Sequence, residues 1–143
     1  VPSTAYPTSD GAHVGIGANG DSIFQRLMRA IGRPDLAEDA HLASNALRVP
    51  HAAAIDAAVA AWTSTHTQAE VLAAMDAATV PAGPIRDVAD LLADPHLNAR
   101  GMIERVPVAG RPLALPAIPP HLSLTPGRVE GCFRADMCTP SSL

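Results

Sequence analysis

Residues 80–102 have the sequence VPAGPIRDVADLLADPHLNARGM, and this stretch decides how the chain turns. Pro81 and Pro84 fix their own φ angles, and each favours an extended conformation in the residue before it. Gly83 lies between them and permits another group to approach the backbone closely. The sequence therefore predicts a stiff loop at Pro81–Pro84.

Two helix starts follow this loop. Asp87 is placed to cap a helix whose third residue is Asp90, and Asp94 precedes a proline at the first position of a second helix. Gly101 offers a left-handed stop for that second helix. The chain is predicted to be helical before this stretch and extended after it, so the stretch forms the corner of the domain.

The composition limits the class of protein. The chain has 143 residues, 48% of them apolar but only 3% aromatic, and a formal charge of −4. All ten basic residues are arginine and they form no stripe, which argues against a nucleic-acid surface and against a polybasic membrane surface. No run approaches the roughly 18 apolar residues of a membrane span, and the first residues lack signal-peptide features. We therefore expect a cytoplasmic protein.

The two cysteines, Cys132 and Cys138, are close together near the end of the chain. We expect a reduced pair, with a disulfide in the tail as the alternative. The sequence offers no second pair of ligands nearby for zinc, so we predict no metal site.

The first half of the chain contains strand and helix signals. Residues 12–18 alternate small and branched apolar side chains, which predicts a strand. Asn19-Gly20-Asp21 ends that strand, and Asp21 is placed to cap a helix over residues 22–31. Gly32 and Pro34 end this helix. Arg48 lies in an irregular connection that follows.

The remaining patterns complete an α+β prediction. Residues 51–62 and a second segment opened by the capping box Thr67–Glu70 are predicted to form a helical hairpin. Residues 102–108 and 112–118 are extended and are expected to pair as strands. Together with short helices, these elements predict a small α+β domain with a small antiparallel sheet.

No complete catalytic set is visible in the sequence. Gly15, Gly17 and Gly20 match G-x-G-x-x-G, but the acidic residue expected about 20 positions later follows a helix, so a structural role is favoured. Asp21 has two interpretations, a helix cap or an active-site carboxylate facing a partner domain. Arg48 is interpreted as a salt-bridging residue, with phosphate binding as the alternative.

Four segments, taken in order, resemble the family III CoA-transferases, also called the CaiB/BaiF family. The family includes formyl-CoA transferases, carnitine CoA-transferases and α-methylacyl-CoA racemases. The matching segments are YPTSDG at 6–11, NGDSIFQRL at 19–27 with GRPDLAED at 32–39, SNALR at 44–48, and VPAGPI through DPHLNARG at 80–101.

The resemblance implies a protein of two domains with different roles. Family members carry a Rossmann-like large domain that binds CoA and holds the catalytic aspartate, and this domain is expected to lie outside the present sequence. We divide the chain into an N-terminal connector (1–11), a small domain (12–118) and an irregular tail (119–143). The chain alone is expected to be inactive.

The resemblance also implies a function, a substrate and partners. The implied reaction is CoA transfer between carboxylic acids, with a coenzyme A thioester as substrate and no covalently bound cofactor. The implied partner is a large CoA-binding domain or a second copy in a homodimer. Two alternatives stay open: a relative of the α-methylacyl-CoA racemases, and a free-standing binding or interaction module without catalysis.

The candidate site follows from the same resemblance, because the active site of the family lies between its large and small domains. We assign no catalytic group to this chain, and Asp21 is only an interface candidate. The residues expected to face substrate or CoA are Gly17, Asn19, Gly20, Asp21, Pro81, Gly83 and Pro84.

Overall fold

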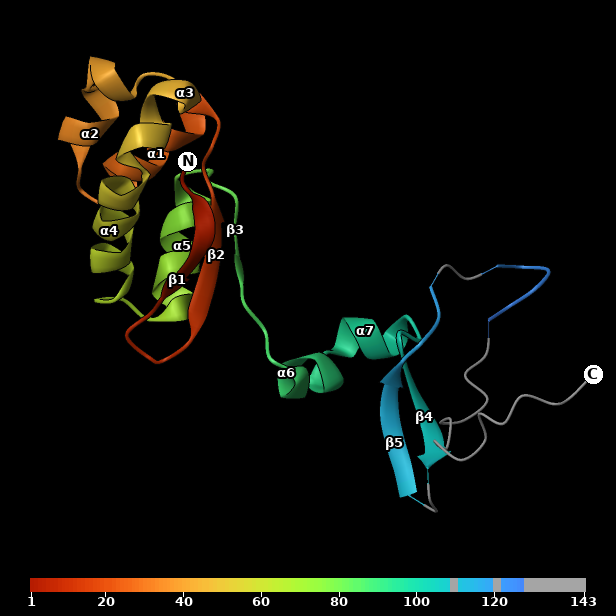
Figure 1. Cartoon of the computed structure of the whole chain (residues 1–143). Helices are drawn as coiled ribbons and strands as arrows, with labels where there is room; N and C mark the ends of the chain where they lie inside the picture. The colour runs from red at the N-terminus through yellow and green to blue at the C-terminus, as the bar shows by residue number, and fades with distance from the viewer. Residues whose placement is uncertain (109–110, 120–121, 128–143) are drawn as a thin grey trace, which may run out of the picture. The chain divides into compact units, whose positions relative to one another are not determined.

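The structure, a computed structural model, describes residues 1–108, 111–119 and 122–127 (Figure 1). The chain divides into two compact units, Val1–Ile85 and Arg86–Leu143. We describe each unit by itself. The architecture is α+β with several short helices, as the sequence predicts, and the described residues form two small antiparallel sheets where the sequence predicted one.

A three-stranded antiparallel sheet forms one layer of the first unit. Its strands are β1 (Ser3–Pro7), β2 (His13–Gly17) and β3 (Ala82–Pro84), in the order β1-β2-β3. The edge strands β1 and β3 end in Pro7 and Pro84. Proline has no backbone N–H, so neither residue can donate a hydrogen bond to a further strand.

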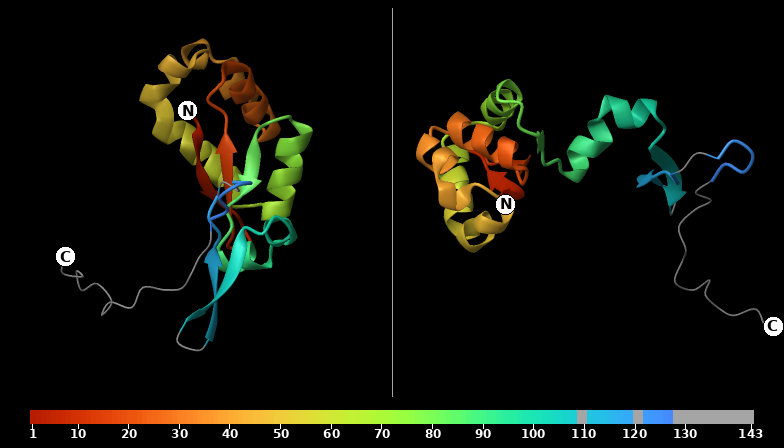
Figure 2. Two further views of the ribbon diagram at one scale, coloured as in Figure 1. Left: turned by 90° about the vertical axis from the view of Figure 1, so that its right-hand side faces the viewer. Right: turned by 90° about the horizontal axis from the view of Figure 1, so that it is seen from above.

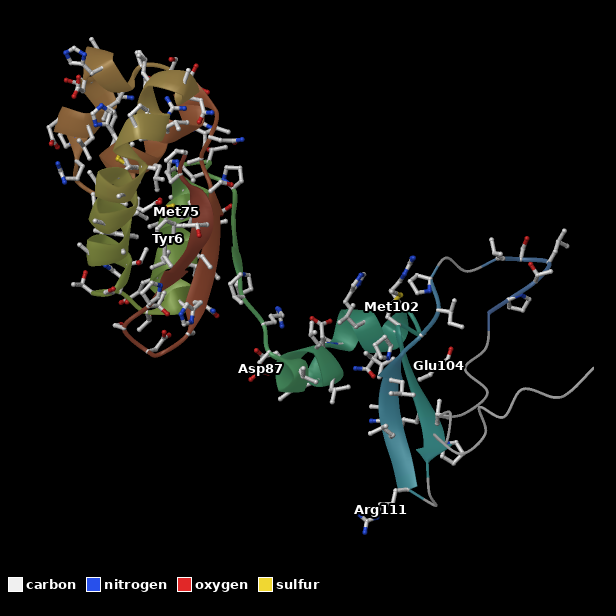
Figure 3. All side chains as sticks on the ribbon, viewed as in Figure 1. Tyr6, Met75, Asp87, Met102, Glu104 and Arg111 are labelled. Atoms are coloured by element: carbon white, nitrogen blue, oxygen red, sulfur yellow. The ribbon has the colours of Figure 1, made fainter. Side chains whose placement is uncertain are left out.

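The helices α4 (Ala52–Thr63) and α5 (Gln68–Ala77) cover one face of this sheet (Figures 1 and 2). Helix α4 contacts β1, and α5 contacts β2 and β3. Tyr6, Val14 and Ile16 point from the sheet into the core, because residues two apart on a strand share a face. Tyr6 of β1 and Met75 of α5 both belong to this core (Figure 3).

Short helices complete the first unit. Helix α1 (Asp21–Ala30) buries Phe24, Leu27 and Met28, which form one apolar face at helical spacing. The predicted stop at Gly32 is confirmed by its φ of 74°, a left-handed conformation that glycine adopts without strain. Between strand β2 and helix α4 the chain forms five short elements: α1 (Asp21–Ala30), α2 (Pro34–Glu38), η1 (Ala40–Leu42), α3 (Asn45–Arg48) and η2 (Val49–His51).

Asp10 joins the β1–β2 turn to the start of α5. Its Oδ1 atom accepts from the Thr8 hydroxyl at 2.6 Å, and its Oδ2 atom accepts from the Gln68 backbone N–H at 3.0 Å. These hydrogen bonds hold the pKa of the Asp10 carboxyl below its usual value, the Thr8 contact most strongly. The predicted capping box of α5, Thr67 with Glu70, is present. Backbone N–H groups at the α5 N-terminus therefore donate to two carboxylates, that of Glu70 in the same helix and that of Asp10 in the β1–β2 turn.

The second unit consists of two short helices and a hairpin: α6 (Val88–Ala93), α7 (Pro95–Ala99), β4 (Ile103–Val108) and β5 (Arg111–Pro116). The predicted caps are confirmed, because Asp87 accepts from the Asp90 N–H and Asp94 accepts from the N–H groups of the first turn of α7. Gly101 has the predicted left-handed φ, 63°. Strands β4 and β5 pair in antiparallel register, as predicted.

Two local predictions were wrong. Asp21 does not cap α1: the N-cap is Gly20, and the Asp21 carboxylate turns to Arg48 instead. Residues 82–84 are not loop but the edge strand β3, because the extended backbone that the two prolines favour can pair with β2. The structure also adds β1 within residues 1–11, the range interpreted as a connector.

Two further observations bear on the sequence predictions. Cys132 and Cys138 lie outside the described residues. None of the helices in the described ranges combines the length and the apolar character needed to cross a bilayer.

Candidate functional site

The Arg48 guanidinium lies at the centre of the corner between β2 and α1. Ser44 caps the short helix α3 through the Leu47 N–H, and this places Arg48 at the helix end, pointing inward. The side chain is 0% exposed. Its Nε atom donates to the Val1 carbonyl at 2.9 Å, and its Nη1 atom donates to the Leu42 carbonyl at 3.0 Å. Arg48 thus ties three separate segments of the chain together.

The Nη2 atom of Arg48 holds the corner itself. It donates to the Asn19 carbonyl at 2.8 Å and to the Asp21 carboxylate Oδ1, also at 2.8 Å. The guanidinium carbon stands 4.5 Å from the centre of the Phe24 ring, a cation–π contact. The salt-bridging interpretation of Arg48 is therefore confirmed. Since the Asp21 side chain is 56% exposed, one side of this ion pair faces outward.

The corner is also attached to the Pro81 segment. The Gly17 N–H donates to the Pro81 carbonyl at 2.9 Å, which joins the end of β2 to the start of β3. The structure therefore brings together five of the predicted site residues, namely Gly17, Asn19, Gly20, Asp21 and Pro81. Gly83 and Pro84 lie farther along β3, opposite Gly15 and Val14 of β2.

The sheet face away from the helices carries glycine at three positions, and the Ile85 side chain lies over one of them, because a Cβ atom at Gly15 would meet Ile85 Cδ1 at 3.4 Å. Gly15 lies opposite Ala5 on one side and Gly83 on the other, and the neighbouring β2 residues Val14 and Ile16 point the other way into the core. A Cβ atom at Gly83 would meet nothing within 4 Å, and one at Gly17 would meet only the Ser3 hydroxyl at 4.0 Å. The fold of this unit does not require glycine at Gly17 or Gly83. We call the surface formed by Ala5, Gly15, Gly17 and Gly83 the outer face.

The sequence interpretation missed a partly buried pair on the opposite side of the sheet. The Tyr6 hydroxyl donates to the Asp56 carboxylate of α4 at 2.6 Å. Burial, and then the neighbouring carboxylate, raise the pKa of the Tyr6 phenol well above its ordinary value. Fifty residues separate the partners, and only the single aromatic position in the YPTSDG segment signalled a special role. This pair fixes the sheet to α4.

The described residues contain no group of three or more His, Cys, Asp or Glu side chains that could hold a metal ion. The corner offers backbone N–H and C=O groups, a buried cation and one half-exposed carboxylate. Such a set can bind and orient a polar ligand. A nucleophile with an adjacent base is not among the groups that meet there.

The model of CoA-transferase family III matches residues 1–132 of the chain. The chain belongs to this family. It is 43% identical over 132 residues to a succinyl-CoA–D-citramalate CoA-transferase from Chloroflexus aurantiacus, an alignment that covers 91% of this chain and 33% of the relative. It is 36% identical to the succinyl-CoA–L-malate CoA-transferase beta subunit of the same organism, covering 90% of this chain and 32% of that subunit.

The solved structures agree with this membership. A CaiB/BaiF family protein from Brucella suis superimposes with a TM-score of 0.69 at 33% identity, covering 88% of this chain and 32% of the other. The family resemblance seen in the sequence is therefore confirmed. The present chain spans about a third of the length of these two Chloroflexus aurantiacus relatives.

Proposed function

We propose that the chain is the small domain of a CoA-transferase that moves CoA from an acyl-CoA to a carboxylic acid. It contributes one wall of the acyl-CoA site, and a large CoA-binding domain supplies the remainder. The acyl donor is succinyl-CoA, and the acceptor is a small carboxylic acid. The observation that carries the proposal is family membership over residues 1–132 together with the 43% identity to a succinyl-CoA transferase.

The geometry of the corner supports this assignment. Arg48 and the Gly17–Pro81 hydrogen bond hold the backbone of residues 17–21 in one arrangement. Pre-arranged backbone groups bind a ligand at a low cost in entropy. The outer face leaves room for a second surface to approach closely at Gly17 and Gly83. We therefore propose that the large domain, or a second copy that provides it, covers these residues.

The chain itself provides binding and positioning in this proposal. A nucleophile and its activating groups belong to the large domain, so the chain alone should not exchange CoA. The relatives reported above are named transferases, and for this reason we favour transfer over the racemase alternative. The free-standing module is the alternative that the following experiment addresses directly.

A chimeric enzyme tests the proposal. Residues 1–132 of this chain replace the matching third of the Chloroflexus aurantiacus succinyl-CoA–D-citramalate CoA-transferase. CoA exchange from succinyl-CoA to D-citramalate is followed by chromatography. We expect the chimera to transfer CoA and the isolated chain to give none.

Two results would contradict the proposal. A chimera that folds and assembles like the parent but transfers no CoA to any small carboxylic acid would contradict the role as a site wall. Transfer by the isolated chain would contradict the claim that the catalytic groups lie elsewhere. The parent enzyme with its own small domain serves as the positive control.

A further inference from the structure

The turn from α5 into β3 contains a left-handed residue that is not glycine. Thr79 has a φ of 54°, and within the described ranges it is the one non-glycine residue with a positive φ. It follows Ala78, the C-cap of α5, at the position where helices commonly end in glycine. A β-branched residue is strained in this conformation, and such strain persists only where surrounding contacts hold it.

Two backbone hydrogen bonds and one side chain hold this turn. The Thr79 N–H donates to the Asp76 carbonyl at 2.9 Å. The Val80 N–H donates to the Met75 carbonyl at 2.8 Å, which closes α5. The side chain is that of Arg26 on α1, whose Nη2 atom donates to the Thr79 carbonyl at 2.9 Å. Since 53 positions separate these two residues, the contact comes from the packing of α1 against α5.

The same turn leads directly to the corner between β2 and α1. Val80 is buried in the core, and the next residue is Pro81, whose carbonyl accepts the Gly17 N–H at 2.9 Å. Pro81 has a fixed φ and no N–H of its own, so the residues before it set the direction of its carbonyl. Thr79 lies only two positions earlier. A change in the backbone angles of Thr79 therefore moves the acceptor that Gly17 uses.

Arg26 contributes little to the stability of the fold by itself. Its Nε atom is buried and meets no acceptor among the described residues. Such an N–H group costs free energy, because it has lost water and gained no partner. The hydrogen bond from Nη2 to the Thr79 carbonyl is exposed, so water can replace it. An uncharged side chain of similar shape in place of Arg26 should therefore leave the stability of the chain nearly unchanged.

We propose that Arg26 is a positioning residue for the acyl-CoA site. It holds the Thr79 carbonyl, which keeps Thr79 left-handed and keeps the Pro81 carbonyl within reach of the Gly17 N–H. The guanidinium acts through the turn and not by contact with the substrate. The corner belongs to the acyl-CoA site by the proposed function, on which this role of Arg26 rests.

Amide hydrogen exchange in the 143-residue chain tests the structural step without an enzyme assay. We expect Arg26→Met to speed exchange at the Gly17 amide roughly threefold to tenfold, the effect of weakening one hydrogen bond. Exchange at the Thr8 amide, which donates to the Ala12 carbonyl in another turn, should stay the same. Arg29→Met on the same helix is the matched control and should change neither amide.

Two further variants separate positioning from a general loss of stability. Glycine adopts the left-handed conformation without strain, so Thr79→Gly in the Arg26→Met background should restore much of the protection of the Gly17 amide. Arg26→Lys keeps a donor and should protect Gly17 better than Arg26→Met does. Circular dichroism melts verify that each variant is folded, and the melting temperatures should stay within a few degrees of one another.

The chimeric enzyme tests the functional step. We expect Arg26→Met to raise the KM for succinyl-CoA roughly threefold to tenfold and to lower kcat less, because a site wall that is no longer pre-arranged mainly weakens binding. Adding Thr79→Gly should return KM towards that of the unmodified chimera, and Arg29→Met should leave both constants unchanged. If the unmodified chimera transfers no CoA, the proposed function fails, whereas the exchange measurement still decides whether Arg26 positions the corner.

Four results would overturn the proposal. The first is a Gly17 exchange rate in Arg26→Met equal to that of the unmodified chain. The second is equal acceleration at Gly17 and Thr8, which would show a loss of global stability alone. The third is faster Gly17 exchange that Thr79→Gly does not reverse. The fourth is an unchanged KM in an active Arg26→Met chimera, because the site would then not depend on the turn.

Discussion

Arg48 is fully buried, yet its guanidinium meets four acceptors, three of them backbone carbonyls. A buried charge is tolerated when its donors are satisfied in this way. The same arrangement makes the residue difficult to replace, because its loss leaves the carbonyls of Leu42 and Asn19 without their donor. An isosteric apolar side chain removes the charge and keeps much of the volume.

We therefore expect Arg48→Met to lower the free energy of unfolding by about 3–5 kcal/mol, since buried acceptors lose their partner. Arg29, whose nearest carboxylate is Glu38 at 4.0 Å on the surface, is the control. Arg29→Met should cost less than about 1 kcal/mol. Denaturant unfolding followed by circular dichroism measures both, and equal costs for the two variants would contradict the prediction.

Tyr6 is the only tyrosine of the chain, so its ionisation is visible without interference. Its pKa in the folded chain is raised, by burial and by the Asp56 carboxylate, above the unfolded value of about 10. The stability that this group contributes is complete below that unfolded value and is lost as the pH rises above it. We expect the tyrosinate absorbance in the ultraviolet to appear only when the helical signal disappears.

The Tyr6→Phe variant provides the matching measurement. It gives no tyrosinate signal. Its free energy of unfolding should fall less steeply at alkaline pH, because the variant has no phenol to ionise. Ionisation of Tyr6 near pH 10 with intact circular dichroism would show that the phenol is not held as we describe.

At the scale of elements, the sequence was informative wherever structure is local. The caps at Asp87, Asp94 and Thr67 were predicted because each depends on residues three positions apart. The role of Asp21 was mistaken because its partner, Arg48, is 27 residues away. A local pattern favours a cap, but a buried cation competes for the same carboxylate.

The same distinction explains the strands and the candidate site. Strand β1 was missed because a short polar segment becomes a strand only when it pairs with β2. Family motifs pointed to the corner at residues 17–21, and Gly17 and Pro81 do meet there. The Tyr6–Asp56 contact has no signature in the sequence, because tertiary packing brings the two residues together.

The outer face permits a prediction at the level of the strand. Gly83→Val adds a side chain where no atom lies within 4 Å, and valine favours strands, so stability should stay the same or rise by about 0.5 kcal/mol. CoA transfer by the chimeric enzyme should fall, because the added side chain blocks the close approach that we propose. Thermal melts and the chromatographic assay measure the two effects.

Ala57→Val, on the exposed side of α4, is the control and should leave transfer unchanged. A Gly83→Val chimera as active as its parent would exclude the outer face from the proposed interface. A strong loss of stability in the Gly83→Val variant would show that a side chain does not fit at this position, contrary to the open space around Gly83.

At the scale of the whole molecule, the main core lies within the first unit. The buried cluster runs from Tyr6 to Val80 and draws on the sheet, α1, α4 and α5. We therefore expect residues 1–85 to fold when produced alone, with cooperative thermal unfolding within a few degrees of the complete chain. Circular dichroism melts of the two proteins make this comparison.

A shorter fragment, residues 1–79, is the matched control. It lacks Val80 and β3, so the Gly17 N–H loses the Pro81 carbonyl, and we expect a lower melting temperature. A broad, non-cooperative transition for residues 1–85 would show that the first unit depends on the second.

The prolines on the edge strands have a consequence for how copies of the chain associate with one another. Pro7 and Pro84 occupy the two edges of the first sheet, and the β4–β5 hairpin carries Pro107, Pro112 and Pro116. Unprotected edges recruit strands from other molecules and lead to aggregation, and proline interrupts that recruitment. The edges of both small sheets should therefore resist amyloid-like polymerisation of the chain.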